Sequence, residues 1–262
     1  MHRAKHLVLR AKRILSRISY ALFLNPQLKE VKYFVVNGWL KILKPFKIKS
    51  MNTEFLAYLL NYQGKTYSQF RQDLFALFIS KNWQEKTFIE IGVGNGIEIS
   101  NTYLLESEHK WDGVLVEPNR EFVDSIRNTR SAKLIEAALT TKDIGEVEFF
   151  TGKRGVFASL VPTRTTNEQS NYRVKSIPVS KVFAEYDRDD LALLSLDIEG
   201  NEEEIIEELM KMKCRPFLII VEHNYDQAKS QRIKHTLIGN QYELLCEGIS
   251  EVDFWFVRKD KF

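Results

Sequence analysis

Strand and helix patterns alternate along the chain from residue 87 onward. Short apolar runs predict five strands, at residues 87–91, 113–117, 133–138, 191–197 and 216–222. Amphipathic runs predict helices between most of these strands and after the fifth, at residues 100–108, 120–128, 202–211 and 227–238. Strands that alternate with helices form parallel sheets, so we expect an α/β, Rossmann-like doubly wound fold.

Two more apolar runs end the chain, at residues 242–246 and 253–257, with a turn-sized gap between them. They predict an antiparallel hairpin beside the mostly parallel sheet. Residues 145–182, between the third and fourth strands, are rich in Thr, Ser, Gly and Arg and contain two short strand patterns, at 146–150 and 174–179. We expect this insertion to lie over the carboxyl ends of the parallel strands, where open α/β sheets bind ligands.

The N-terminal part of the chain divides into two segments. Residues 51–86 predict helices, and Ser68 before one of them is a candidate N-cap. Residues 4–22 predict an amphipathic helix with arginines beside its apolar face. Residues 1–50 carry 12 Lys and Arg and one acid, whereas residues 51–262 carry 26 Lys and Arg and 34 acids. The basic character therefore belongs to an N-terminal helical arm, and not to the α/β domain.

The basic arm has two interpretations. It could rest on an anionic membrane surface, with arginines at the headgroups and apolar residues below them. It could instead pack on the α/β domain or on a second subunit, with its basic face in solvent. Nucleic acid is not expected as a partner, because no base-stacking module accompanies the charge.

Length and composition fit one α/β domain with additions. The chain has 262 residues, of which 44% are apolar, enough for a substantial core. Cys214 and Cys246 have no metal-ligand spacing and form no disulfide framework, which indicates a reducing compartment. No uncharged apolar run approaches the length of a membrane span, and the start of the chain lacks the apolar core of a signal peptide. We therefore expect a cytoplasmic protein whose arm could contact the inner face of the membrane.

The segment TFIEIGVGNGIEIS, residues 87–100, suggests a cofactor site. Gly92, Gly94 and Gly96 predict a tight turn between a buried strand and a helix N-terminus, where a ligand can approach the backbone closely. A dinucleotide-binding turn carries G-x-G-x-x-G, whereas the third glycine here comes one residue early. Glu117 follows about 20 residues later, where an acid commonly binds the ribose of an adenosine cofactor. This spacing favours a cofactor without a pyrophosphate, and S-adenosylmethionine is the obvious candidate.

A series of segments between residues 67 and 224 resembles the FkbM-type methyltransferases, a family of class I S-adenosylmethionine enzymes. The segments are SQFRQDLF, FIEIGVGNGIEISNTYLLE, WDGVLVEPN, IEAAL, LLSLDIEGNE and IIVEHN, in the order and spacing of that family. The resemblance implies a class I methyltransferase fold, S-adenosylmethionine as methyl donor, and a hydroxyl acceptor, often on a sugar or a natural product. It does not cover the arm.

The resemblance also implies which residues bind the donor. They are Gln69, Glu90, Gly92, Gly94, Asn95, Glu117, Asn119, Ala137, Ala138 and Asp197. Glu90 and the glycine turn would surround the methionine part, Glu117 would hold the ribose, and the two alanines would face the adenine. Asp197 would lie near the reacting methyl group. Glu90 replaces the Asp that is usual in the family, which gives a longer reach to the same amino group.

The acceptor requires separate groups, because a hydroxyl is a poor nucleophile whose proton must leave as the methyl transfers. The candidate catalytic residues are Asp197, Glu222 and His223, which lie at the ends of the fourth and fifth strands. His223 could take the proton directly. Alternatively, Asp197, Glu199 and Glu222 could hold Mg²⁺, which would acidify the hydroxyl. The structural interpretations are that Glu199 favours a helix N-terminus and that His223 is a buried histidine with satisfied hydrogen bonds.

The sequence thus predicts an S-adenosylmethionine-dependent O-methyltransferase that modifies a hydroxyl of a sugar, a polysaccharide or a glycosylated natural product. Among enzymes, the alternative is a nicotinamide-dependent oxidoreductase, against which the glycine spacing argues. From another class, the alternative is a non-catalytic binding module that is held at a membrane by its basic arm.

Overall fold

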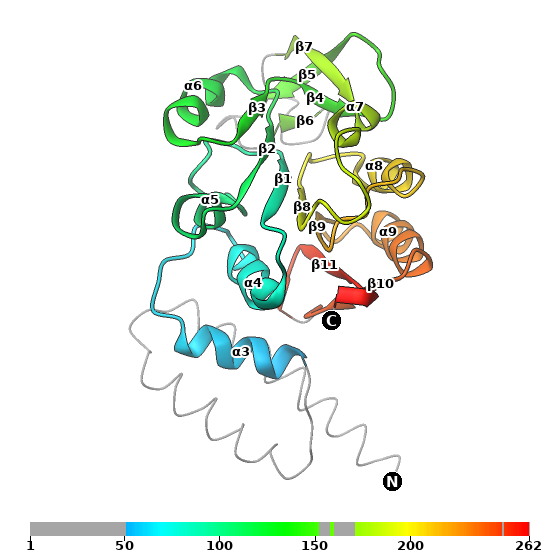
Figure 1. Cartoon of the computed structure of the whole chain (residues 1–262). Helices are drawn as coiled ribbons and strands as arrows, with labels where there is room; N and C mark the ends of the chain where they lie inside the picture. Colours follow the sequence, from blue (N-terminus) through cyan, green and yellow to red (C-terminus); the bar gives the residue numbers. More distant parts are fainter. Residues whose placement is uncertain (1–50, 152–157, 160–170, 248, 262) are drawn as a thin grey trace, which may run out of the picture. The chain divides into compact units, whose positions relative to one another are not determined.

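The computed structural model describes residues 51–151, 158–159, 171–247 and 249–261 (Figure 1). The basic arm lies outside this range, so its two interpretations stay predictions. The described residues divide into a smaller unit, 51–64 with 245–251, and a larger unit, 65–244 with 252–261. In the smaller unit, helix α3 (Met51–Asn61) contains Tyr58, whose ring lies against the rings of Phe55 and Tyr62. Within the described ranges, no helix is both long and apolar enough to cross a membrane.

A seven-stranded sheet of order β10-β11-β9-β8-β1-β2-β3 forms the centre of the larger unit (Figure 1). Its strands are β1 Thr87–Ile91, β2 Asp112–Val116, β3 Lys133–Ile135, β8 Leu193–Leu196, β9 Leu218–Glu222, β10 Tyr242–Leu245 and β11 Asp253–Arg258. β1 pairs in parallel with β2 and β8, β2 with β3, and β8 with β9, whereas β11 runs antiparallel to β9. The predicted fold class, a doubly wound and mostly parallel sheet, is confirmed.

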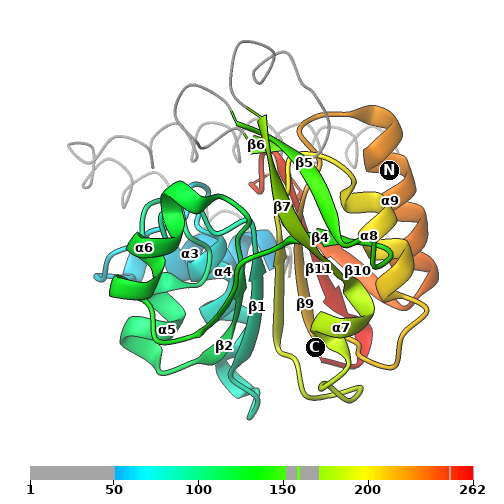
Figure 2. The ribbon, with the colours of Figure 1, turned by 90° about the horizontal axis from the view of Figure 1, so that it is seen from above.

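Helices cover both faces of this sheet (Figure 2). They are α4 Gln72–Ile79, α5 Tyr103–His109, α6 Arg120–Thr129, α7 Val179–Phe183, α8 Glu202–Leu209 and α9 Gln227–Gly239. Seen from above, α5 and α6 lie on one side of the sheet and α8 and α9 on the other. Because β8 and β9 are covered on both faces, all their residues are buried, and their sequences LLSL and LIIVE lack the alternation of a half-exposed strand.

The main hydrophobic core includes the inner faces of α8 and α9. Ile205 and Leu209 of α8 and Ile233 and Leu237 of α9 are buried, each pair at helical spacing. Burying one such side chain contributes roughly 1.5–3 kcal/mol through removal of its apolar surface from water. This packing fixes the two strands whose ends carry the candidate catalytic carboxylates.

A second sheet of order β4-β7-β5-β6 lies within the region of the predicted insertion. Its strands are β4 Ala138–Thr140, β5 Glu146–Thr151, β6 Ala158–Ser159 and β7 Asn171–Pro178. β5 pairs antiparallel with β6 and β7, and β4 pairs in parallel with β7. Ala138, Phe149 and Val174 form its small core. The strands expected at 146–150 and 174–179 are therefore both present, with shifted bounds.

The predicted end of the third strand, at residue 138 of the range 133–138, is wrong. The strand β3 stops at Ile135, and the N–H of Ala137 donates to the carbonyl of Ile135 at 3.1 Å, which closes a tight turn. Ala138 then leaves the main sheet and pairs with β7 as the start of β4. The single apolar run thus connects the two sheets.

Two helix starts also differ from the predictions. The helix expected from residue 100 begins at Tyr103, and the glycine turn does not lead directly into a helix N-terminus. Ser68 is not the N-cap of α4: that position is taken by Arg71, in the left-handed region with a φ of 66°. The Ser68 hydroxyl instead donates to Asp73 Oδ1 at 2.6 Å and accepts from the Asp73 N–H at 3.3 Å, so it closes the loop before the helix.

Candidate functional site

A pocket opens at the carboxyl ends of β1, β2 and β8, where the strand order of the main sheet reverses. Open α/β sheets bind ligands at such switch points. The lining residues are Glu90, Ile91, Gly92, Val93, Gly94, Ile99, Asn101, Glu117, Pro118, Phe122, Ala137, Ala138, Leu139, Phe149, Asp197, Ile198 and Glu199. Its lining combines apolar side chains with a few converging polar groups, as is usual for small-molecule sites.

Most of the predicted donor-binding residues line this pocket. They are Glu90, Gly92, Gly94, Glu117, Ala137, Ala138 and Asp197. The other three have different surroundings. Gln69 is exposed, Asn95 Oδ1 accepts the N–H groups of residues 97 and 98 within its own loop, and Asn119 caps α6 by accepting the Glu121 N–H at 3.0 Å. All ten binding roles stay predictions.

The glycines of the turn have unequal roles. Gly92 has a φ of 80°, and a Cβ there would lie 1.7 Å from the backbone oxygen of Asp197, so it allows β1 and β8 to pack closely. Gly96, at φ 88°, faces the side chain of Ile126, 3.2 Å from an added Cβ. Gly94 has a φ of 60° and no heavy atom within 4 Å of such a Cβ. Of the three, only Gly94 leaves open space beside the backbone for a ligand.

Glu117 lies against the glycine turn. Its Oε2 accepts the N–H groups of Val93 and Gly94 at 2.8 and 2.9 Å, and its Oε1 accepts the N–H of Asn119 at 2.8 Å. Burial raises the pKa of Glu117 to about 7, although these three hydrogen bonds lower it. The carboxylate that follows β2 is therefore positioned by the turn itself.

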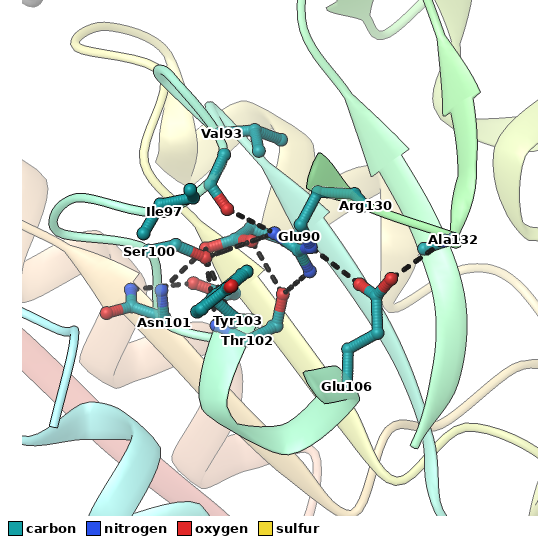
Figure 3. Close-up of polar contacts among 12 residues, drawn as sticks. Glu90, Val93, Ile97, Ser100, Asn101, Thr102, Tyr103, Glu106, Arg130 and Ala132 are labelled. Atoms are coloured by element: carbon teal, nitrogen blue, oxygen red, sulfur yellow. Dashed lines mark hydrogen bonds and ion pairs between the residues drawn. The ribbon is translucent and has the colours of Figure 1, made fainter. Parts of the chain in front are cut away.

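Glu90 is buried, and both its oxygens bind the loop that follows the glycine turn (Figure 3). Oε1 accepts the Asn101 N–H at 2.7 Å, and Oε2 accepts the hydroxyls of Ser100 at 2.9 Å and Thr102 at 2.6 Å. These contacts also explain the late start of α5, since residues 100–102 bond to a strand instead of to a helix.

Arg130 connects Glu90 to Glu106 of α5 (Figure 3). Its Nε donates to Glu106 Oε2 at 2.6 Å, its Nη1 lies 3.5 Å from Glu90 Oε2, and only 1% of its side chain is exposed. Nη1 also donates to the Gly96 carbonyl at 3.1 Å and Nη2 to the Thr102 hydroxyl at 2.8 Å. We did not predict this residue from the sequence, where it lies among other basic residues after a helix.

Three carboxylates meet at the ends of β8 and β9. Asp197, Glu199 and Glu222 each place one oxygen within 4.8 Å of the others, a geometry that could hold a metal ion. The side chain of Asn224 donates to Glu222 at 2.6 Å and to Glu199 at 3.1 Å. The carboxyls of Asp197 and Glu222 thus lie close enough to influence each other's protonation.

Burial and neighbouring carboxylates raise the pKa values of Asp197 and Glu222. Burial, followed by the charge of Glu199, raises the pKa of Glu222 to about 8. Burial, followed by the charge of Glu222, raises the pKa of Asp197 well above its usual range. Two adjacent carboxyls cannot both ionise easily, so the pair shares a proton near neutrality. Such a pair can take up a proton at physiological pH.

The surroundings of His223 are those expected of a buried structural histidine. Its ring stacks on Phe254 with 4.0 Å between the centroids, and its Nδ1 accepts the Tyr225 N–H at 3.0 Å. It is 6% exposed and does not line the pocket. Its catalytic role stays a prediction.

Strained backbone marks the same region. Glu199, Asn224 and Tyr225 have φ values of 54°, 48° and 58° after β8 and β9, and Ile99 has 57° in the loop after the glycines. A positive φ is unfavourable for residues other than glycine, and most unfavourable for a β-branched one such as Ile99. Such strain is common at functional sites.

Several residues that line the pocket were not predicted from the sequence. They are Phe122, Leu139, Phe149 and Ile198, which supply apolar wall, and Asn101, which supplies a polar group. The apolar ones carry no distinguishing signal, because residues of this type also fill the core. Asn101 did carry a signal, because it lies in the segment SNTYLLE, which resembles the family.

The sequence matches the family model described as the methyltransferase FkbM domain over residues 90–256, well over half of the chain. None of the curated proteins matches it. Among solved structures, a precorrin-6y C5,15-methyltransferase from Geobacter metallireducens GS-15 is 13% identical, covers 75% of this chain and 91% of its own, and has a TM-score of 0.40. The SAH-bound methyltransferase PaMTH1 of Podospora anserina is 10% identical, with 86% and 96% covered and a TM-score of 0.41. The plantazolicin methyltransferase BpumL in complex with SAH is 10% identical, with 93% and 84% covered and a TM-score of 0.39.

These structures are too distantly similar to indicate the activity of this chain. The family match does indicate it, because it spans the glycine turn, Glu117 and the carboxylates at the ends of β8 and β9. The resemblance seen in the sequence segments is confirmed. The chain belongs to the family of methyltransferases with an FkbM domain, and its reaction is methyl transfer.

Proposed function

We propose that this protein transfers the methyl group of S-adenosylmethionine to a hydroxyl group of its acceptor. The observation that carries the proposal is the pocket at the switch point, which joins Glu117 and the glycine turn to Asp197. Glu117 and the glycine turn suit an adenosine-based donor. The carboxyl pair of Asp197 and Glu222 suits removal of a proton from the acceptor.

The residues of the pocket fit such a donor. Glu117 accepts three N–H groups, while a carboxylate can accept about four hydrogen bonds, so capacity remains for a ribose hydroxyl. Phe122, Leu139 and Phe149 offer apolar surface for an adenine ring. Asn101 also lines the pocket; its side-chain oxygen is buried, has no hydrogen-bond partner in the described part of the chain, and could accept a donor group of the ligand.

S-adenosylmethionine would supply a methyl group on a positively charged sulfur, which the acceptor oxygen displaces as the carbon–sulfur bond breaks. The role of the chain at the acceptor is to remove the hydroxyl proton. Asp197 lines the pocket and lies beside Glu222, so the proton passes to this pair. The amide of Asn224 stabilises the negative charge on Glu222. A base whose pKa is near the working pH contributes about 10²–10⁴-fold to the rate.

A groove beside the pocket supports an acceptor with an apolar part. It shares Leu139 and Ile198 with the donor pocket and is lined by β4, β5 and α8. Its apolar residues are Leu139, Ile144, Val147, Phe150, Ile198 and Ile205. Its polar residues are Thr140, Thr141, Lys142, Glu148, Asn201 and Glu204. This mixture suits an acceptor that carries both sugar hydroxyls and an apolar portion, as a glycosylated natural product does. Of the acceptors predicted from the sequence, we therefore propose a glycosylated natural product.

Binding and transfer assays test the function. We expect the full-length protein to bind S-adenosylhomocysteine in isothermal titration and to transfer labelled methyl from S-adenosylmethionine to glycosylated natural products in cell extracts. Asp197→Asn should keep the binding and slow the transfer by about 10²–10⁴-fold. Binding of NAD instead would support the oxidoreductase alternative. Binding without transfer, and no effect of the variant, would support the non-catalytic module.

The pH profile of the reaction reports the carboxyl pair. Because the pKa of Glu222 is about 8, kcat should rise about tenfold per pH unit below pH 8 and level off above it. Glu222→Gln removes the charge that raises the pKa of Asp197, so the rising limb should move to lower pH. An unchanged limb in the variant would contradict a role of the pair as base. EDTA should leave the profile unchanged; a loss of activity that Mg²⁺ restores would instead assign these carboxylates to a metal.

The same shift predicts how stability depends on pH. The pKa of Glu222 rises from 4.5 to about 8 on folding, so the folded protein binds more protons than the unfolded chain between these values. Stability from this group is present below pH 4.5 and is lost as the pH rises toward 8. Glu222→Gln should therefore raise the melting temperature relative to wild type more at pH 8 than at pH 5. Equal differences at both pH values would contradict the shift.

A further inference from the structure

Asn101 lies at the wall of the donor pocket, and among the described residues its carboxamide oxygen has no hydrogen-bond partner. The residue is 9% exposed and its Oδ1 is buried. A buried acceptor without a partner is costly, and a ligand that donates to it removes this cost. The position of the oxygen therefore indicates where the ligand carries a hydrogen-bond donor.

The rest of Asn101 is held in place. Its Nδ2 donates to the Ser195 hydroxyl of β8 at 2.9 Å, and its backbone N–H donates to Glu90 of β1 at 2.7 Å. Figure 3 shows Asn101 beside Ser100, with its side chain directed away from Glu90. Two strands of the sheet thus hold the side chain of Asn101 in place before any ligand binds.

Glu90, which the sequence predicted beside the amino group of the donor, already uses its lone pairs. Its oxygens accept from Ser100, Asn101 and Thr102, and Arg130 lies 3.5 Å away. A carboxylate accepts about four hydrogen bonds, so a ligand would have to displace one of these partners. Its contacts make Glu90 a positioning residue for the loop that carries Asn101.

The charge around Asn101 favours a cation. Glu90 and Glu106 supply two negative charges to the network and Arg130 one positive charge, which leaves a net negative charge beside the pocket. The methionine part of the proposed donor ends in an ammonium group, which donates three hydrogen bonds and accepts none. It is the group of the donor that matches both the unpaired oxygen and the sign of the charge.

We propose that Asn101 Oδ1 accepts a hydrogen bond from the ammonium group of the donor, and that Glu90 fixes Asn101 for this contact. The inference rests on the proposed function, since it takes S-adenosylmethionine as the donor. It assigns recognition of the amino group to a side chain in the loop before α5, eleven residues after Glu90.

Three nucleosides test this contact by isothermal titration with the full-length protein. S-adenosylhomocysteine carries the amino and carboxylate groups, 5′-(3-aminopropylthio)-5′-deoxyadenosine lacks only the carboxylate, and 5′-methylthioadenosine lacks both. Asn101→Ala should weaken the first two by about 10- to 100-fold and leave the third within twofold of wild type. Asn128→Ala, at an exposed position of α6, should change none of the three.

Other outcomes would overturn the proposal. Equal weakening of all three nucleosides would mean a merely structural role, and weakening of S-adenosylhomocysteine alone would assign Asn101 to the carboxylate. If Asn101→Ala does not fold, Asn101→Asp keeps an acceptor oxygen and should bind the aminopropyl nucleoside at least as tightly as wild type; weaker binding would overturn the proposal. A wild-type protein that binds none of the three would refute the proposed function, whereas wild-type binding with unaffected variants would refute only the role of Asn101.

Discussion

Arg130→Met is expected to lower the free energy of unfolding by about 3–5 kcal/mol, the usual cost of breaking a buried ion pair from one side. The substitution leaves the carboxylates of Glu90 and Glu106 without their cation, and these side chains are only 2% and 8% exposed. It also removes the hydrogen bond to the carbonyl of Gly96. Urea denaturation followed by circular dichroism measures the loss.

The affinity for S-adenosylhomocysteine should fall in the same variant, because Arg130 joins the glycine turn to the loop that carries Asn101. Arg130→Lys keeps the charge but cannot reproduce the forked contacts, so it should restore stability only in part. Arg127→Met, in α6 three residues before Arg130, is the matched control: its ion pair with Glu136 is exposed, and its loss should cost less than about 1 kcal/mol. Equal losses in the two methionine variants would contradict the role assigned to the buried network.

Gly92→Ala should destabilise the protein by about 4 kcal/mol or more, in the range of the most damaging single substitutions. Its Cβ would lie 1.7 Å from the backbone oxygen of Asp197, so β1 and β8 would have to separate where the pocket is built. Because this oxygen belongs to the backbone, a side-chain rotation cannot relieve the clash. Thermal denaturation with and without S-adenosylhomocysteine measures both the loss of stability and the loss of the site.

Gly94→Ala provides the comparison, because Gly94 also has a positive φ but has open space where the Cβ would lie. It should cost only about 1–2 kcal/mol, from backbone strain. Its main effect should be on donor binding, since the added methyl group projects beside the pocket. A loss of stability as large as that of Gly92→Ala would contradict the close packing of β1 on β8.

Much of the fold follows from local patterns. The five parallel strands were predicted because they are short apolar runs between helices, and the C-terminal strands because they lie a turn apart. The pocket was located by the same reasoning, since the ends of parallel strands meet at one edge of a sheet. Glu117 and Asp197 were therefore predicted next to the glycine turn, and both line the pocket.

The misplaced bounds have a common cause. The strand predicted over 133–138 splits at Ile135, because Ala138 pairs with a strand more than thirty residues later. The helix predicted from residue 100 starts at Tyr103, because Ser100, Asn101 and Thr102 bond to Glu90. In both cases a partner distant in space outweighs the local preference of the chain.

By itself, the sequence determined the doubly wound sheet, the glycine turn beside Glu117 and the methyltransferase family, because periodicity and motif spacing are properties of neighbouring residues. Only the tertiary structure decided which groups face the ligand. In the folded protein Glu90 pairs with Arg130, and Asp197 lies beside Glu222. Among the described residues, the side-chain oxygen of Asn101 has no hydrogen-bond partner. The physical reason is that burial and pairing depend on contacts such as that between Asn101 and Ser195, which lie 94 residues apart.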